Sequence, residues 1–145
     1  MGRLSQQLGE AGEERARWFF AENGFRCVEK IFTPMRNIKG RAVYVKESSV
    51  DFIVVIPLNG SIIQSKVARV EVKLCDGNKL PHSVLEDHQI KTLTEWDSWG
   101  NWSFVLWVHK SDCFMIRYPC DFFKYGKSIS VEKAKKVSAF KSCGK

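Results

Sequence analysis

Two apolar segments that carry ionisable residues constrain this chain more than any other feature. Residues 50–56 have the length and composition of a buried strand but include Asp51, and a second apolar run ends in Glu71-Val72-Lys73. A charged side chain in such a strand is costly to bury, so it must lie at an exposed strand end or take part in chemistry. Because side chains alternate along a strand, Glu71 and Lys73 share one face and their valine neighbours form the other.

These three side chains have the chemistry of a metal-dependent phosphodiesterase centre. Mg²⁺ binds hard oxygen ligands and keeps several waters, so Asp51 and Glu71 suffice to hold it against a phosphate. The ammonium of Lys73 would orient the attacking water or stabilise developing negative charge. The plain alternative is a solvated Glu-x-Lys on an exposed strand face, and the presence of Asp51 in the preceding strand favours the metal site.

Asp51 and Glu71 share a metal only if they lie close together in a hairpin. A two-residue turn at Asn59-Gly60 would pair Asp51 with a residue three positions before Glu71, roughly 10 Å away at a strand rise of about 3.3 Å. The metal site therefore requires a wider loop or a bulge within residues 57–67, with Ser65-Lys66 in the irregular part.

The order of the expected elements predicts an α/β fold in which helices flank a mixed β-sheet. Strands are expected over residues 25–32, 50–57, 67–75, 103–109 and 113–118, with a hairpin reaching toward residue 46. Helices are expected over residues 4–23 and 84–96 and near the C-terminus, the first with Ser5 as its N-cap and Asn23-Gly24 as its stop. Trp18 and Trp107 are expected in the core, and the role of Trp99 is left open.

Short motifs follow one another along residues 9–125: Gly9-x-x-x-Glu13, Phe32-Thr33-Pro34, Arg41-Ala42-Val43-Tyr44, Lys46-x-Ser48-Ser49-x-Asp51-Phe52, Glu71-Val72-Lys73, His88-Gln89-Ile90 and the apolar residues 102–108. This series resembles the RecU-type Holliday junction resolvases, which belong to the PD-(D/E)XK nuclease superfamily. Phe32 and Val54 stand where the family usually has Pro and Gly, which suggests a divergent or phage member.

The resemblance implies a restriction-endonuclease-like sheet with a protruding basic β-hairpin whose turn is at Asn37–Gly40. It also implies a structure-selective endodeoxyribonuclease that uses Mg²⁺, with Mn²⁺ as a substitute, and resolves four-way DNA junctions by paired symmetric nicks. At 145 residues the chain suits a single nuclease domain, with a basic extension from about residue 126. Because a junction offers two symmetric strands to cut, we expect a C₂ homodimer.

Our mechanism hypothesis assigns a role to each residue of the expected centre. Mg²⁺ is held by Asp51, Glu71 and the Val72 carbonyl, with a further acidic contact from Glu13. Lys73 positions the nucleophilic water. Gln89 either holds a water or the scissile phosphate, or simply caps its helix.

The charge of the chain favours an anionic partner. The formal net charge is +7 and the isoelectric point is near 9.3. Seven lysines follow residue 123, in a tail that is either a short helix or a solvated extension. A second basic segment precedes Asp51 and is expected to contact DNA, unless it is merely a surface hairpin; its cations are Lys30, Arg36, Lys39, Arg41 and Lys46.

Other classes of protein fit the sequence less well. The five cysteines are odd in number and show no Cys-x-x-Cys spacing, which disfavours a zinc site or a disulfide framework. We find no signal peptide or transmembrane run, so a cytoplasmic location without a membrane or small-molecule cofactor is expected. Two rivals remain: another PD-(D/E)XK endonuclease, of restriction or repair type, that reads base sequence, and a non-catalytic basic DNA-binding module.

Overall fold

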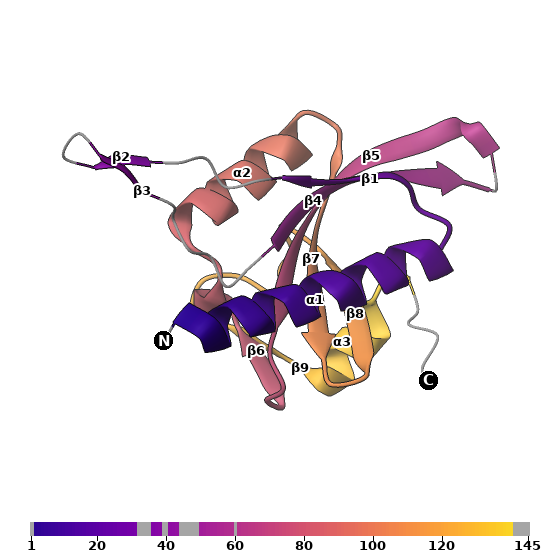
Figure 1. Cartoon of the computed structure of the whole chain (residues 1–145). Coiled ribbons are helices and arrows are strands. Elements are labelled where there is room, and N and C mark those ends of the chain that lie inside the picture. Colours follow the sequence, from indigo (N-terminus) through magenta and orange to yellow (C-terminus); the bar gives the residue numbers. More distant parts are fainter. Residues whose placement is uncertain (1, 32–35, 39–40, 44–49, 60, 141–145) are drawn as a thin grey trace.

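A five-stranded mixed sheet with helices on both faces forms the body of the protein (Figure 1). The computed structural model describes residues 2–31, 36–38, 41–43, 50–59 and 61–140. In spatial order the strands are β1 (Arg26–Ile31), β4 (Val50–Leu58), β5 (Ser61–Leu74), β7 (Trp102–His109) and β8 (Asp112–Arg117). β5 and β7 run parallel and the other neighbours are antiparallel, which confirms the predicted mixed sheet flanked by helices.

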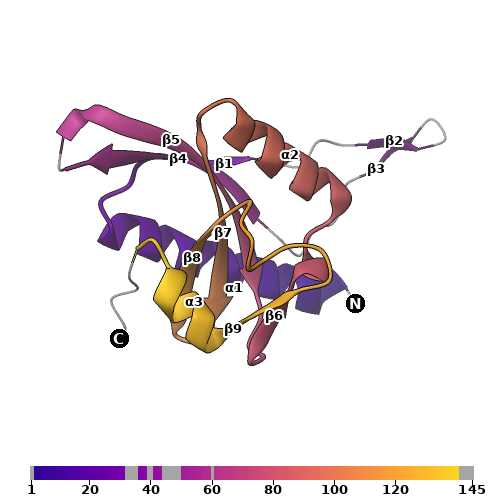
Figure 2. The same cartoon turned by 180° about the vertical axis from the view of Figure 1, so that it is seen from behind.

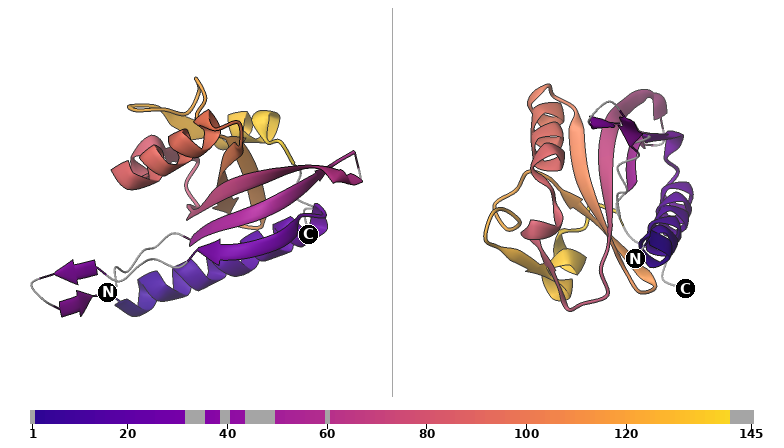
Figure 3. Two further views of the ribbon diagram at one scale, coloured as in Figure 1. Left: turned by 90° about the horizontal axis from the view of Figure 1, so that it is seen from above. Right: turned by 60° about the vertical axis from the view of Figure 1, so that its left-hand side comes forward.

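Helix α1 (Gly2–Glu22) covers one face of the sheet (Figure 3). Its buried Phe19 and Phe20 join an apolar cluster with Phe52 and the valines of β4 and β5. The helix ends as predicted, because the Asn23 N–H donates to the Phe19 carbonyl and Gly24 adopts a φ of +73°.

Two expectations for α1 are wrong. The helix begins at Gly2, so Ser5 lies inside it and is not its N-cap. Trp18 is 66% exposed and does not belong to the core. Trp18 follows the buried Ala16 by two residues, or about 200° around a 3.6-residue helix, which turns its side chain away from the sheet.

The opposite face of the sheet carries helices α2 (Asp87–Ser98) and α3 (Val131–Val137) (Figures 2 and 3). The Ser103 hydroxyl of β7 donates to the Leu93 carbonyl of α2 at 2.7 Å and ties this helix to the sheet. Trp107 is fully buried in the second apolar cluster, as predicted. This cluster also contains Leu80, Leu93, Val105, Ile129 and Ala134.

Short elements complete this second layer and were not predicted. Strands β6 (Lys79–Pro81) and β9 (Ser128–Ser130) form a separate antiparallel pair, followed after β6 by the 3₁₀ turn η1 (His82–Val84). Helix α2 therefore starts later than the sequence pattern suggested. The Ser130 side chain caps α3, whose Ala134 is buried, so this part of the predicted basic extension packs into the body.

The hairpin of β4 and β5 has the register that the metal-site prediction required. Asp51 pairs directly with Glu71, and regular pairing continues as far as Pro57 and Ser65. The pairing then shifts, so that Leu58 pairs with Ser61. The predicted bulge is confirmed, but it falls at residues 62–64 instead of Ser65 and Lys66, which are regularly paired. The shift follows Pro57, which has no N–H to give to a ladder.

Strands β2 (Arg36–Ile38) and β3 (Arg41–Val43) form a small antiparallel pair apart from the main sheet (Figures 1 and 2). Asn37 and Ile38 belong to β2, so the predicted turn at Asn37–Gly40 begins later than expected. Lys39, Gly40 and Lys46 lie outside the described residues.

The cysteines of the described chain are free thiols, namely Cys27, Cys75, Cys113 and Cys120. Burial raises the pKa of the Cys113 thiol to about 11, so it stays protonated and unreactive at neutral pH. In the part of the chain that the structure describes, no helix has both the length and the apolar character needed to cross a bilayer.

Candidate active site

The α2 face of the sheet carries three of the ionisable residues that the sequence singled out, namely Asp51, Glu71 and Lys73. Asp51 lies at the start of β4, directly opposite Glu71 of β5, and Lys73 follows two residues later. Glu71 is 3% exposed and Lys73 is 8% exposed. These values exclude the alternative of a solvated Glu-x-Lys pair. The division of β5 into a chemical face and an apolar face is confirmed, because Val70 and Val72 pack with the α1 cluster.

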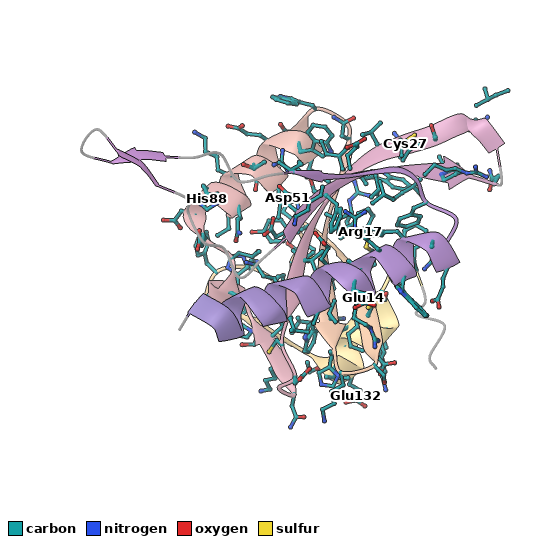
Figure 4. The ribbon with its side chains drawn as sticks, viewed as in Figure 1. Glu14, Arg17, Cys27, Asp51, His88 and Glu132 are labelled. Atoms are coloured by element: carbon teal, nitrogen blue, oxygen red, sulfur yellow. The ribbon has the colours of Figure 1, made fainter. Side chains whose placement is uncertain are left out.

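A pocket opens where β4, β5 and α2 meet. It encloses about 290 Å³, including its open mouth, and is lined by Asp51, Arg69, Glu71, His88, Gln89, Thr92 and Leu93. The space open to the centres of water-sized molecules is about 50 Å³, and one buried water needs roughly 10–15 Å³ of such space, so the pocket has room for a few waters. Figure 4 shows Asp51 on β4 and His88 on the first turn of α2. Lys73 is not among the lining residues, and its Nζ lies 3.8 Å from Oε1 of Glu71.

Asp51 is held by Arg69, a residue that the sequence interpretation missed. The Nε and Nη2 groups of Arg69 both donate to Asp51 Oδ2, at 3.0 and 2.6 Å. About one fifth of each side chain is exposed (20% and 19%), so the ion pair is partly screened by solvent. The alternation of side chains along β5 could have identified Arg69, because residues 69, 71 and 73 must project from one face of the strand.

Glu71 is contacted by Gln89 from α2 and by Lys73 from its own strand. Gln89 Nε2 donates to Glu71 Oε1 at 2.8 Å, and Lys73 Nζ lies 3.8 Å from the same oxygen. The Gln89 carbonyl oxygen accepts the Glu86 N–H at 2.9 Å, at the start of α2. Since a backbone N–H can only donate, this bond turns the NH₂ group of Gln89 toward Glu71. Gln89 therefore caps its helix and faces the site as well.

Side chains of opposite charge are paired at the site. Two carboxylates, Asp51 and Glu71, are matched by the cations of Arg69 and Lys73. Buried charges are tolerated only when they are paired and hydrogen-bonded in this way.

Glu13 lies elsewhere. Helix α1 runs over the opposite face, where a Cβ at Gly12 would lie 3.8 Å from the Val72 side chain. Glu13 Oε1 is 2.6 Å from Nζ of Lys30, a β1 residue paired with Phe52. In the described residues, no three His, Cys, Asp or Glu side chains gather closely enough to hold a metal ion. The structure thus brings Asp51 and Glu71 together, but not Glu13 with them.

The predicted DNA contacts are only partly described. Lys30 takes part in the ion pair with Glu13, so its cation faces α1. Arg36 is the first residue of β2 and pairs with Val43, whereas Arg41 is the first residue of β3 and pairs with Ile38, so the two cations lie at opposite ends of the β2–β3 pair.

The donor set of the site fits Mg²⁺ or Mn²⁺ by its chemistry. Asp51 and Glu71 offer hard oxygen ligands from directly paired positions, and Mg²⁺ needs only one or two carboxylates besides its waters. His88 lines the pocket but no cysteine does, so the described lining lacks the combination of thiolates and imidazoles that structural zinc sites use. Val72, whose carbonyl is the predicted third ligand, lies between Glu71 and Lys73 in a strand paired on both sides. Neither a protein-family model nor a curated protein matches this chain.

Proposed function

We propose that this chain is a metal-dependent endodeoxyribonuclease that hydrolyses phosphodiester bonds in branched DNA, with four-way junctions as its substrate. The observation that carries the proposal is the direct pairing of Asp51 with Glu71 at a pocket, with the Lys73 ammonium beside Glu71. Two carboxylates that line one pocket, with an amine beside one of them, match the needs of phosphodiester hydrolysis. The proposal includes a restriction-endonuclease-like arrangement of the sheet.

In this mechanism Asp51, Glu71 and the Val72 carbonyl hold the metal. Bound Mg²⁺ supplies charge neutralisation on the phosphate and lowers the pKa of a water. Lys73 positions the attacking water and donates to the negative charge that develops on the phosphate. Gln89 keeps the Glu71 carboxylate oriented through its bond to Oε1. Glu13 and Lys30 stabilise the packing of α1 on β1 and affect the site only through the sheet.

The net charge of +7 supports DNA as the partner. We propose that the β2–β3 pair, with Arg36 and Arg41, is the basic hairpin that enters the junction, and that two copies of the chain present two centres to the two strands. Phosphate contacts of this kind position the protein without reading sequence.

The decisive experiment incubates the purified chain with a labelled four-way junction and with linear duplexes of the same sequences, with Mg²⁺, Mn²⁺ or EDTA. We expect paired symmetric nicks in the junction only when a metal is present. Sequence-specific cleavage of the linear duplexes would instead assign a restriction or repair type of PD-(D/E)XK enzyme. Salt-sensitive binding with no hydrolysis in either metal would assign a non-catalytic DNA-binding module.

A further inference from the structure

The Arg69 guanidinium lies next to Asp51, where its positive charge would repel a metal ion bound to that carboxylate. Its two N–H groups converge on Oδ2 of a carboxylate that the mechanism needs as a metal ligand. Both residues line the pocket, so the guanidinium faces the space in which metal and phosphate would meet. A cation in hydrogen-bond contact with a ligand oxygen opposes the approach of a dication.

We propose that Arg69 couples metal binding to phosphate binding, so that the metal is held weakly until DNA arrives. The proposal rests on the function proposed above. Arg69 and Lys73 already place two positive charges beside the two carboxylates, so a dication would bring more positive charge close to the Arg69 guanidinium. A DNA phosphate would offset that added charge.

The guanidinium is suited to move between the two anions. Its planar set of donors binds phosphate and carboxylate oxygens equally well. Arg69 is one-fifth exposed, so its outer nitrogens need not cross a packed core to reach a ligand in the pocket. When Arg69 turns its donors to the phosphate, Asp51 Oδ2 no longer accepts the two Arg69 hydrogen bonds and can offer its lone pairs to the metal. By linkage, the metal must then strengthen phosphate binding by the same factor.

A purely structural ion pair makes a different prediction. If Arg69 served only to hold β4 against β5, its removal would lower the stability of the sheet and would not increase metal affinity. The pair formed by Arg117 and Asp97, with Nη2 3.2 Å from Oδ1, offers a matched control at a distance from the pocket lining.

The test measures Mn²⁺ binding by electron paramagnetic resonance, without DNA, in the wild type and in Arg69→Gln, Arg69→Lys and Arg117→Gln. We expect Arg69→Gln to bind Mn²⁺ roughly tenfold more tightly, within the usual range of coupling between sites. Arg69→Lys keeps the charge, so its Mn²⁺ affinity should stay near that of the wild type, as should that of Arg117→Gln.

The same titration is repeated with a junction whose backbone is fully phosphorothioate and resists hydrolysis. This DNA should strengthen Mn²⁺ binding by the wild type and should have a smaller effect on Arg69→Gln. Unchanged or weaker Mn²⁺ binding by a folded Arg69→Gln protein overturns the proposal. If that variant does not fold, a large gain in affinity by Arg69→Lys overturns it instead. The readout is metal binding, so absence of cleavage by the wild type would refute the proposed function separately.

Discussion

The two faces of the sheet are formed by the same strands but are stabilised by different interactions. On the α1 face, Phe52, Val54 and Val70 are fully buried among other apolar side chains. On the α2 face the neighbouring residues Asp51 and Glu71 are carboxyl side chains that accept hydrogen bonds from Arg69 and Gln89. The first face is stabilised by removal of apolar surface from water, and the second also depends on charge compensation. The contrast shows that one strand can contribute alternate side chains to the apolar core and to the candidate active site.

The difference between the two faces is tested most sharply by substituting adjacent residues whose side chains project from opposite faces of the sheet. We expect Asp51→Asn and Lys73→Ala each to lower the rate of junction cleavage by about 10³-fold or more, because each removes a group that acts on the reacting phosphate. Single-turnover cleavage measures the rate. Junction affinity should stay nearly unchanged, since it depends on Lys and Arg contacts to phosphates. Undiminished cutting by either variant would remove that residue from the mechanism.

Phe52→Ala should lower the stability of the protein and leave the cleavage rate nearly unchanged. The ring is fully buried and packs edge to face on Phe20, with centroids 5.3 Å apart. Its loss should lower the free energy of unfolding by about 3–5 kcal/mol, because a cavity replaces the ring. Urea titration measures the change. Where the variant is still folded, its cleavage rate per folded molecule should stay within a few-fold of the wild type, and a loss as large as that of Asp51→Asn would contradict the division between the faces.

An intermediate effect is expected for Gln89, which joins α2 to the charged face. Gln89→Ala removes the donor to Glu71 and the acceptor for the Glu86 N–H. Partners that orient a metal ligand typically contribute 10–100-fold to activity, so cleavage should fall by roughly that factor. Gln89→Glu serves as a comparison: it keeps the acceptor but places a second negative charge beside Glu71, and Mn²⁺ binding should distinguish the two variants.

The smallest expected effect is on the pH dependence of stability. On the α2 side, His82 is buried, contacts the Tyr118 hydroxyl at 2.8 Å, and has its pKa lowered from 6.5 by burial. Because the folded state binds this proton less readily than the unfolded chain, the contribution of His82 to stability is complete above about pH 6.5 and declines as the pH falls below it. Urea titrations at pH 5 and pH 7.5 should show this decline, and His82→Gln should reduce it.

Much of the candidate site could be predicted from local pattern. The alternation of β5 separated Glu71 and Lys73 from their valine neighbours, and the need for a bulge followed from counting residues between Asp51 and Glu71. The position of the bulge could not be predicted, because Ser65 and Lys66 are no less suited to regular pairing than residues 62–64. The exposure of Trp18 was missed because its large apolar side chain was given more weight than its angle on the helix.

By itself, the sequence determined the five strands of the main sheet, the end of α1 and the face on which each residue of β5 lies, because these features depend on backbone geometry over a few residues. Only the tertiary structure decided that Arg69 binds Asp51, that the amide of Gln89 turns toward Glu71, and that Glu13 pairs with Lys30. These contacts join residues 17 or 18 positions apart along the chain, so they depend on strand register and on which helix covers which face, and no short pattern encodes either.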